Sequence, residues 1–239
     1  MDRLSWTDIR AEQERGRGTV VVAFGATEQH GPHLPLATDA LLGDHLARLI
    51  ADRLDAFVAP TVRIGCSEHH LEFPGTISLT PDTFHRVVAD IVASLAKGGF
   101  ERVVLIPTHG GNFGPLGEAV EKLGRDPGIE VSALTDLTAL LAIAQLGERD
   151  HGVPMGEGGL HAGEWETSML VAIHPELVHM ERGEPGYTGD PQQAAGAIFG
   201  AGIHTISENG VIGDPARSSA ENGERYWDEV VRITLEKLG

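Results

Sequence analysis

A run of apolar residues at positions 19–24 constrains the fold most, because it leads into a loop that cannot become helix. The run is β-branched and aromatic, and it predicts a buried strand. Residues 25–39 follow directly and contain Pro32 and Pro35. Each proline lacks an N–H and restricts the residue before it, so the loop stays extended or turned. The chain therefore begins with a strand that delivers a stiff loop to one end of a sheet.

The same order of strand, loop and helix recurs along the chain. The expected strands cover residues 19–24, 57–60, 102–107 and 130–134. The expected helices cover residues 6–17, 39–54, 81–97, about ten residues after Asn112, 137–146, a segment ending before Pro175, and 219–238. Strands that alternate with helices predict an α/β fold with a parallel sheet, which binds ligands at the carboxyl edge of its strands.

Two connections are expected to lack regular structure. Residues 147–159 are rich in glycine and are predicted to form a mobile lid, and residues 181–218 are predicted to be loops. We find no internal repeat or linker, so residues 1–239 are expected to form a single domain.

Composition excludes several classes of protein. The formal net charge of −17 would repel nucleic acid and anionic membranes. No apolar run approaches the ~20 residues that cross a bilayer. Cys66 is the single cysteine, which rules out an internal disulfide. With no visible signal peptide, these features predict a cytoplasmic protein.

The predicted loops carry many potential metal ligands. They are Glu28, His30, Asp39, His69, His70, His109, His161 and Glu164. Carboxylates and neutral imidazoles suit Zn²⁺, Mn²⁺ or Fe²⁺. Two metal ions about 3.5–4 Å apart require a bridging ligand, and Asp39, at the start of a helix, is the candidate.

Four motifs stand in order in these loops: EQHGPHLP at 28–35, FPGT at 73–76, HGGN at 109–112 and HAGEWETS at 161–168. Together they resemble the creatininase family of metal-dependent amidohydrolases, from about residue 4 to residue 230. The resemblance implies a single three-layer α/β/α sandwich with a mostly parallel sheet. It also implies two divalent metal ions and a homohexamer.

The resemblance also implies site residues. Glu28, Asp39 and His109 would hold one metal ion, and His30 and Asp39 would hold part of the other. His161 matches the catalytic histidine that carries a proton to the leaving nitrogen.

Two departures from creatinine hydrolases point away from creatinine as substrate. Those enzymes have an acidic ligand where this chain has Gly111, and they use tryptophans to cover the substrate, whereas the segment around Asp136 has no aromatic residue. Glu164 would lie one helical turn from His161, so Glu164 is predicted to replace the missing ligand and to act in catalysis. Glu166 is expected to point elsewhere and to orient a ligand.

The resulting hypothesis is a hydrolase that cleaves the C–N bond of a small cyclic amide or formamide with a metal-bridging hydroxide. His70, Gly110, Gly111 and Asn112 are predicted to bind the substrate. Three alternatives stay open: a formamide deformylase of riboflavin or deazaflavin synthesis, a peptidase that matures mycofactocin, and a non-catalytic metal-binding module.

Overall fold

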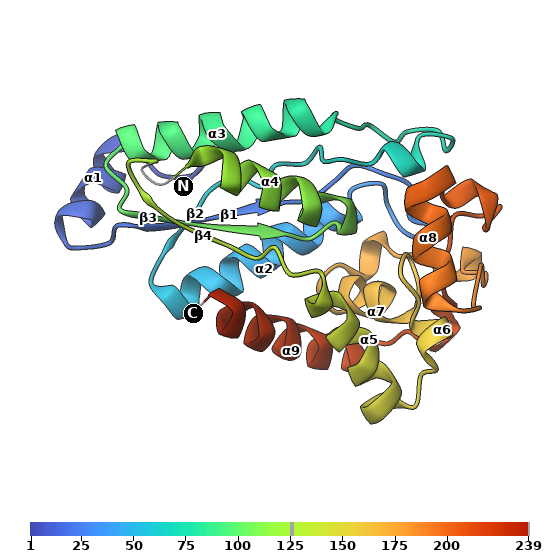
Figure 1. Cartoon of the computed structure of the whole chain (residues 1–239). Helices are drawn as coiled ribbons and strands as arrows, with labels where there is room; N and C mark the ends of the chain where they lie inside the picture. The colour runs from blue at the N-terminus through green and yellow to red at the C-terminus, as the bar shows by residue number, and fades with distance from the viewer. Residues whose placement is uncertain (125–126, 239) are drawn as a thin grey trace.

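The computed structural model describes residues 1–124 and 127–238, which contain one sheet of four parallel strands (Figure 1). The strands are β1 (Thr19–Phe24), β2 (Phe57–Val58), β3 (Arg102–Pro107) and β4 (Glu130–Ala133), in the spatial order β2-β1-β3-β4. β1 pairs with β3 along its whole length, from Thr19 beside Arg102 to Phe24 beside Pro107. Both strands therefore end at the same level of the sheet.

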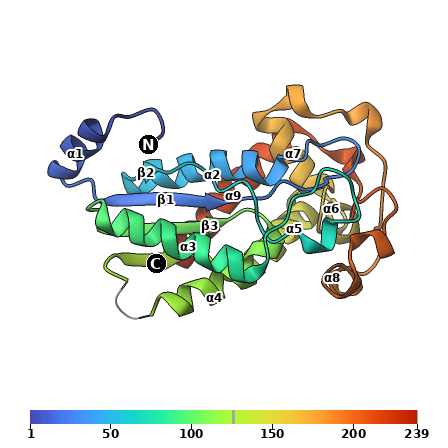
Figure 2. The same ribbon diagram turned by 90° about the horizontal axis from the view of Figure 1, so that it is seen from above.

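Helices cover both faces of the sheet, which confirms the three-layer α/β/α prediction. One face packs against α3 (Pro81–Lys97) and α4 (Phe113–Leu123), and the other packs against α2 (Thr38–Leu54) and α9 (Ala220–Leu238) (Figures 1 and 2). Side chains along β1 alternate between the two cores, with Val21 on one side and Val22 on the other. Burial on both faces explains why the strands are uninterrupted apolar runs.

Further helices gather beyond the carboxyl ends of the strands (Figure 1). They are α5 (Thr138–His151), α6 (Met155–Gly158), α7 (Glu164–Ile173) and α8 (Pro191–Ala201), whereas α1 (Trp6–Glu14) lies at the opposite end. Short 3₁₀ turns occur at Glu68–His70, Gly110–Asn112, Pro175–Leu177, Met180–Arg182, Ile203–Thr205 and Pro215–Arg217. Within the described residues, no helix is both long enough and apolar enough to cross a membrane.

Two expected loops are partly helical. The predicted lid at 147–159 contains the end of α5 and all of α6, and the predicted loop at 181–218 contains α8. Asp190 caps α8 by accepting hydrogen bonds from the N–H groups of Gln192 and Gln193, and Pro191 occupies its first turn. Because only Ala194 and Ile198 of α8 are buried, the helix lacks the apolar periodicity that would predict it.

Candidate metal centre and active site

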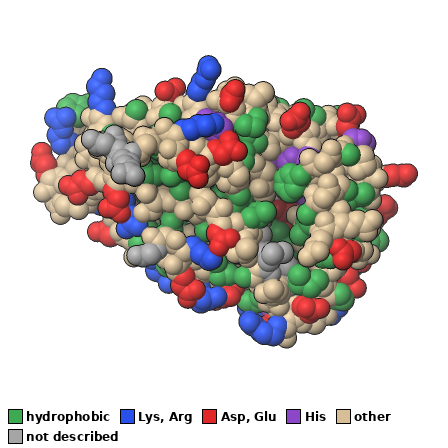
Figure 3. Space-filling model, in the orientation of Figure 1, with side chains coloured by type: hydrophobic (Ala, Val, Ile, Leu, Met, Phe, Trp, Pro, Cys, Tyr) green, Lys and Arg blue, Asp and Glu red, His purple; other side chains and the backbone are tan. Residues whose placement is uncertain are grey.

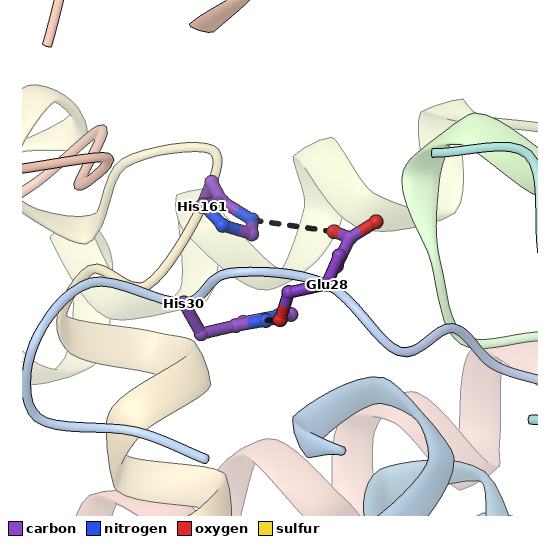
Figure 4. A group of neighbouring side chains, drawn as sticks. All are labelled: Glu28, His30 and His161. Carbon is purple, nitrogen blue, oxygen red and sulfur yellow. Dashed lines mark hydrogen bonds and ion pairs between the residues drawn. The ribbon is translucent and has the colours of Figure 1, made fainter. Parts of the chain in front are cut away.

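A cluster of buried carboxylates and imidazoles lies beyond the ends of β1 and β3. Three overlapping groups of side chains there could each hold a metal ion, with ligand atoms within 4.8 Å of one another. The groups are Glu28, His30 and His161; Glu28, Asp39 and His109; and His30, Asp39 and Glu166. Figure 4 shows how Glu28 and His30, from the loop after β1, face His161 from the loop before α7. The structure thus brings together the ligands predicted from both the first and the last motif, together with Glu166.

Hydrogen bonds to main-chain carbonyls fix which ring nitrogen of each ligand histidine faces the cluster. His30 Nδ1–H donates to the carbonyl of Glu28 at 3.2 Å, and His109 Nε2–H donates to the carbonyl of Cys66 at 3.1 Å. The remaining nitrogens, His30 Nε2 and His109 Nδ1, therefore face the carboxylates, where they can bind a proton or a metal ion. Partners of this kind orient metal-binding imidazoles and select their tautomer.

Asp39 lies between these two imidazoles. Its Oδ1 is 3.3 Å from His30 Nε2, and its Oδ2 is 3.4 Å from His109 Nδ1. The same two nitrogens face a second carboxylate each: His30 Nε2 is 3.6 Å from Glu166 Oε1, and His109 Nδ1 is 3.2 Å from Glu28 Oε1. One oxygen of Asp39 is thus available on each side, as a bridging carboxylate requires.

Several of these atoms have no hydrogen-bond partner within residues 1–124 and 127–238. They are both carboxylate oxygens of Glu28, Oδ2 of Asp39 and Nε2 of His30. Buried acceptors that face one another are costly unless a proton or a cation lies between them. Burial opposes charge on the imidazoles, yet the neighbouring carboxylates raise the pKa of His30 and of His109 well above its ordinary value. The donor set, which is all oxygen and imidazole nitrogen, fits divalent Zn, Mn or Fe.

Glu164 is the clearest correction to the sequence prediction. Its carboxylate is fully buried and points away from the cluster, and it accepts hydrogen bonds from Ser168 Oγ at 2.9 Å, Asn222 Nδ2 at 2.8 Å and Tyr226 OH at 2.6 Å. It therefore joins α7 to α9 and has no free oxygen to offer a substrate or a metal ion. The assignment of Glu164 as ligand and catalytic residue is wrong for this geometry.

Glu166 occupies the position expected for Glu164. Its Oε2 accepts a hydrogen bond from the N–H of Ala162 at 2.6 Å, which leaves Oε1 directed at His30. The predicted helical turn from His161 does not exist, because α7 begins at Glu164 and Ala162 before it has a φ of 52°. His161 instead lies in an extended segment that pairs with Ile212, so helical spacing from His161 does not apply.

His161 is held at the edge of the cluster. Its Nε2–H donates to the main-chain carbonyl of Gln29 at 2.7 Å, and its Nδ1 lies 3.9 Å from Glu28 Oε1 (Figure 4). Burial, together with the charge of His30, lowers the pKa of His161 to about 3. The imidazole is therefore neutral near pH 7, with a lone pair on Nδ1 that faces the ligands.

A cavity of about 690 Å³ opens above the cluster. Its floor is formed by His69, His70, His109, Gly110, Gly111 and His161, and apolar side chains of α8 such as Ile198 and Phe199 form a wall. A second hollow of about 800 Å³ shares His69, Gly110, Gly111 and Phe199 with the first. Figure 3 shows the surface hollowed beside the α8 end of the molecule. His70, Gly110 and Gly111, which the sequence predicts to bind the substrate, line this cavity.

Asn112 does not face this cavity. Its side-chain amide donates to the carbonyls of Phe24 and Gly25, both at 3.0 Å, and accepts from the N–H of Cys66 at 2.9 Å. All of its polar atoms are used in joining the loops after β1 and β3. The predicted role in substrate binding is therefore corrected to one in holding these loops together.

Gly111 stands where creatinine hydrolases are expected to have an acidic metal ligand. The structure has no room for a side chain at this position. A Cβ at Gly111 would lie 2.4 Å from the carbonyl oxygen of Cys66, 2.4 Å from His109 Nε2 and 2.8 Å from His69 Cε1. At Gly110, no atom lies within 4 Å of a Cβ. The space for an acidic ligand on this loop is filled, which leaves Glu166 as the carboxylate beside His30.

This difference between adjacent glycines gives a direct test. Gly111→Ala should lower the free energy of unfolding by about 1–3 kcal/mol, as overpacking does, and should reduce metal content by displacing His109. Gly110→Ala, the matched control, should change neither quantity. Denaturant titration and metal analysis of both variants check this, and equal behaviour of the two would contradict it.

Comparisons with known proteins agree with this geometry. The chain matches a family model described as creatininase (creatinine amidohydrolase) over residues 2–238. It is 33% identical over 228 residues to the mycofactocin precursor peptide peptidase of Mycolicibacterium smegmatis, covering 92% of this chain and 83% of that protein. It is also 28% identical to the creatinine amidohydrolase of Pseudomonas putida, covering 96% of this chain and 92% of that protein.

Solved structures show the same fold. A mutant creatininase of Zn-Zn type aligns with a TM-score of 0.80 and 26% identity, covering 99% of this chain and 95% of that one. A structure described as creatininase Mn aligns with a TM-score of 0.78 and 25% identity, covering 99% and 96% of the two chains. The predicted architecture is thereby confirmed in detail.

Proposed function

Because this chain belongs to the creatininase family, we propose that it is a metal-dependent amidohydrolase and that its substrate is a peptide. The observation that carries the catalytic part of this proposal is the position of Asp39. Its two oxygens face the imidazoles of His30 and His109 on opposite sides, and His109 lines the cavity. This arrangement suits two divalent ions that share one carboxylate.

The described residues divide into two ligand sets around Asp39. Glu28, Asp39 and His109 would hold one ion, and His30, Asp39 and Glu166 would hold the other. When bound, such ions lower the pKa of a coordinated water and polarise an amide carbonyl. Main-chain N–H groups near Gly110 and Gly111, on the floor of the cavity, would stabilise charge that develops on the carbonyl oxygen.

His161 would move the proton. Its neutral ring presents the Nδ1 lone pair beside Glu28, so it can accept a proton from the attacking water and deliver it to the leaving nitrogen. The N–H on its other ring nitrogen stays bound to the carbonyl of Gln29, so the ring keeps its orientation through the reaction.

Two observations favour a peptide over the small amide expected from the sequence. Mycofactocin precursor peptide peptidases from mycobacteria are 31–33% identical to this chain, against 28% for the creatinine amidohydrolase of Pseudomonas putida. The cavity also shares Gly110 and Gly111 with a second hollow, so the two together offer room for a substrate longer than a small cyclic amide. A small cyclic amide is the second candidate, because the creatininase structures share the fold over nearly the whole chain.

A panel of substrates separates the two candidates. Protein loaded with Zn²⁺ or Mn²⁺ is incubated with a peptide library, creatinine and simple formamides, and the products are identified by mass spectrometry. New peptide termini support the peptidase, and turnover of creatinine or a formamide alone would replace it with a small-amide hydrolase. Assembly as a homohexamer stays a prediction from the family resemblance.

Removing the metal tests whether the site is catalytic. Chelation should abolish amide hydrolysis and leave the far-UV circular dichroism unchanged, because the two apolar cores on either side of the sheet do not include the ligand cluster. Addition of Zn²⁺ or Mn²⁺ should restore turnover. If chelation instead unfolds the chain, the ions are structural, and the non-catalytic metal-binding module becomes the better description.

A further inference from the structure

Gln29 lies between two of the metal-ligand candidates, and its side chain is only 5% exposed. Its Oε1 accepts a hydrogen bond from the N–H of Gly31 at 2.9 Å. Because an N–H can only donate, this contact fixes which end of the amide is oxygen and which is nitrogen. The Nε2 group, with two hydrogens, must therefore point into the site.

Three groups lie within hydrogen-bond distance of this nitrogen and its two hydrogens. Gln29 Nε2 lies 2.9 Å from His70 Nδ1, 3.0 Å from His161 Nε2 and 3.1 Å from the carbonyl oxygen of Gly210. The choice among them is decided by the main chain of Gln29 itself. Its carbonyl oxygen is 2.7 Å from His161 Nε2, and a carbonyl can only accept, so His161 Nε2 carries a hydrogen.

The proton positions of both imidazoles follow. His161 Nε2 is a donor, so the two hydrogens of the Gln29 amide go to His70 Nδ1 and to the carbonyl of Gly210. His70 Nδ1 is then an acceptor. An imidazole whose Nδ1 accepts a hydrogen bond carries its ring proton on Nε2, so the proton of His70 is on Nε2.

The two rings therefore face the site with opposite roles. His70 Nε2, which carries the proton, lies 3.3 Å from Glu28 Oε1, and His161 Nδ1, which carries the lone pair, lies 3.9 Å from the same oxygen. The ring centroids are 4.5 Å apart. A proton donor and a proton acceptor thus stand side by side at the floor of the cavity.

We infer that Gln29 is a positioning residue that holds His70 as a hydrogen-bond donor and His161 as a proton acceptor. The use of the two rings rests on the proposed function. In amide hydrolysis, the oxygen of water bonds to the carbonyl carbon while His161 Nδ1 takes a proton from that water. His161 then delivers the proton to the leaving nitrogen as the C–N bond breaks. His70 keeps its proton and donates a hydrogen bond to the carbonyl oxygen throughout.

Gly210 makes this arrangement possible. Its φ is 79°, and a Cβ there would lie 2.0 Å from Gln29 Oε1. Any side chain at this position would collide with the Gln29 amide, so the close approach of the two segments requires glycine. The amide is held at its oxygen by the Gly31 N–H and at its nitrogen by the hydrogen bond to the Gly210 carbonyl.

The test is to observe the tautomers directly. In metal-free protein labelled with ¹⁵N-histidine, solid-state NMR should show His70 protonated on Nε2 and His161 protonated on Nε2, with assignments from His70→Asn and His161→Asn. Gln29→Glu places an acceptor opposite His70 and should move the His70 proton to Nδ1. The same variant, loaded with metal, should keep its metal content and KM and lose about 10–100-fold in kcat, the usual cost of removing a partner that orients a ligand.

Gln13→Glu, on α1 and far from the cluster, is the matched control and should leave tautomers and kcat unchanged. A wild-type protein with the His70 proton on Nδ1 would overturn the inference without any variant. Wild-type tautomers and kcat in Gln29→Glu would overturn it as well. If the tautomers are as expected but no amide is hydrolysed, the proposed function fails and the role of Gln29 in setting the tautomers stands.

Discussion

Asp39→Ala is expected to remove both metal ions and to abolish amide hydrolysis in a single substitution. The reason is that Asp39 is the carboxylate shared between the two imidazoles, with Oδ1 toward His30 and Oδ2 toward His109. Of these two imidazoles, Glu28 lies within 4 Å of His109 and Glu166 lies within 4 Å of His30, whereas Asp39 lies that close to both. Metal analysis of the purified variant, followed by assays at saturating Zn²⁺ or Mn²⁺, measures both effects.

Asp44→Ala provides the control for Asp39→Ala. Asp44 is on the same helix, but it pairs with Arg63 at the surface, so its loss should leave metal content and turnover intact. Surface ion pairs of this kind contribute about 0–1 kcal/mol to stability. If Asp39→Ala retains two ions and near-normal turnover, Asp39 is not the bridge and the two-ion proposal fails.

Glu166→Gln and Glu164→Gln should affect different properties of the protein, although the two residues are only two positions apart in the sequence. Glu166→Gln removes the charge directed at His30, so we expect metal content to fall from two ions toward one and turnover to be strongly reduced. Glu164→Gln should keep both ions. It should instead lower the free energy of unfolding by about 1–3 kcal/mol. The reason is that the buried side chain at position 164 loses its charge and one of the two oxygens that accept hydrogen bonds from Asn222 and Tyr226.

Each of the two glutamate variants is the control for the other. Metal analysis and denaturant titration on both separate a lost ligand from a lost packing contact. Two ions in Glu166→Gln together with one ion in Glu164→Gln would reverse the assignment made from the structure and restore the one made from helical spacing.

The strands and most helices could be predicted because their apolar periodicity is strong. Residues 19–24 and 102–107 were expected as strands with the bounds observed for β1 and β3. Their loops were expected at one edge of the sheet, and parallel pairing does place Glu28 and His109 together, with Glu28 Oε1 3.2 Å from His109 Nδ1. For these ligands, topology alone is sufficient.

The ligand on α7 could not be predicted in the same way, because it depends on where a helix begins. Shifting that start changes which face each side chain occupies. The sequence favoured a turn that included His161, whereas Ala162 has a positive φ and α7 begins two residues later. Glu164 and Glu166 are two residues apart in the first turn of α7, and residues at this spacing lie on different faces of a helix. Only one of them can therefore face the cluster.

Gln29 was not singled out from the sequence, since a glutamine is neither a metal ligand nor a titratable group. Its importance lies in the contacts with His70 and with the carbonyl of Gly210, which is 181 positions away in the chain. No local pattern reports such a contact. The signal that was present is its place between Glu28 and His30, in the most constrained loop of the chain.

The hydrogen bond from Tyr226 to Glu164 has a consequence for biosynthesis. The segment that carries Glu166 is attached to α9, which follows every metal-ligand candidate in the sequence. A nascent chain that has produced Glu28, Asp39 and His109 can hold one ion weakly, but the second set is completed only after translation of α9 ends. Because a ligand set that forms only on folding couples metal affinity to folding, loading of both ions reports that the chain has been synthesised and folded through α9.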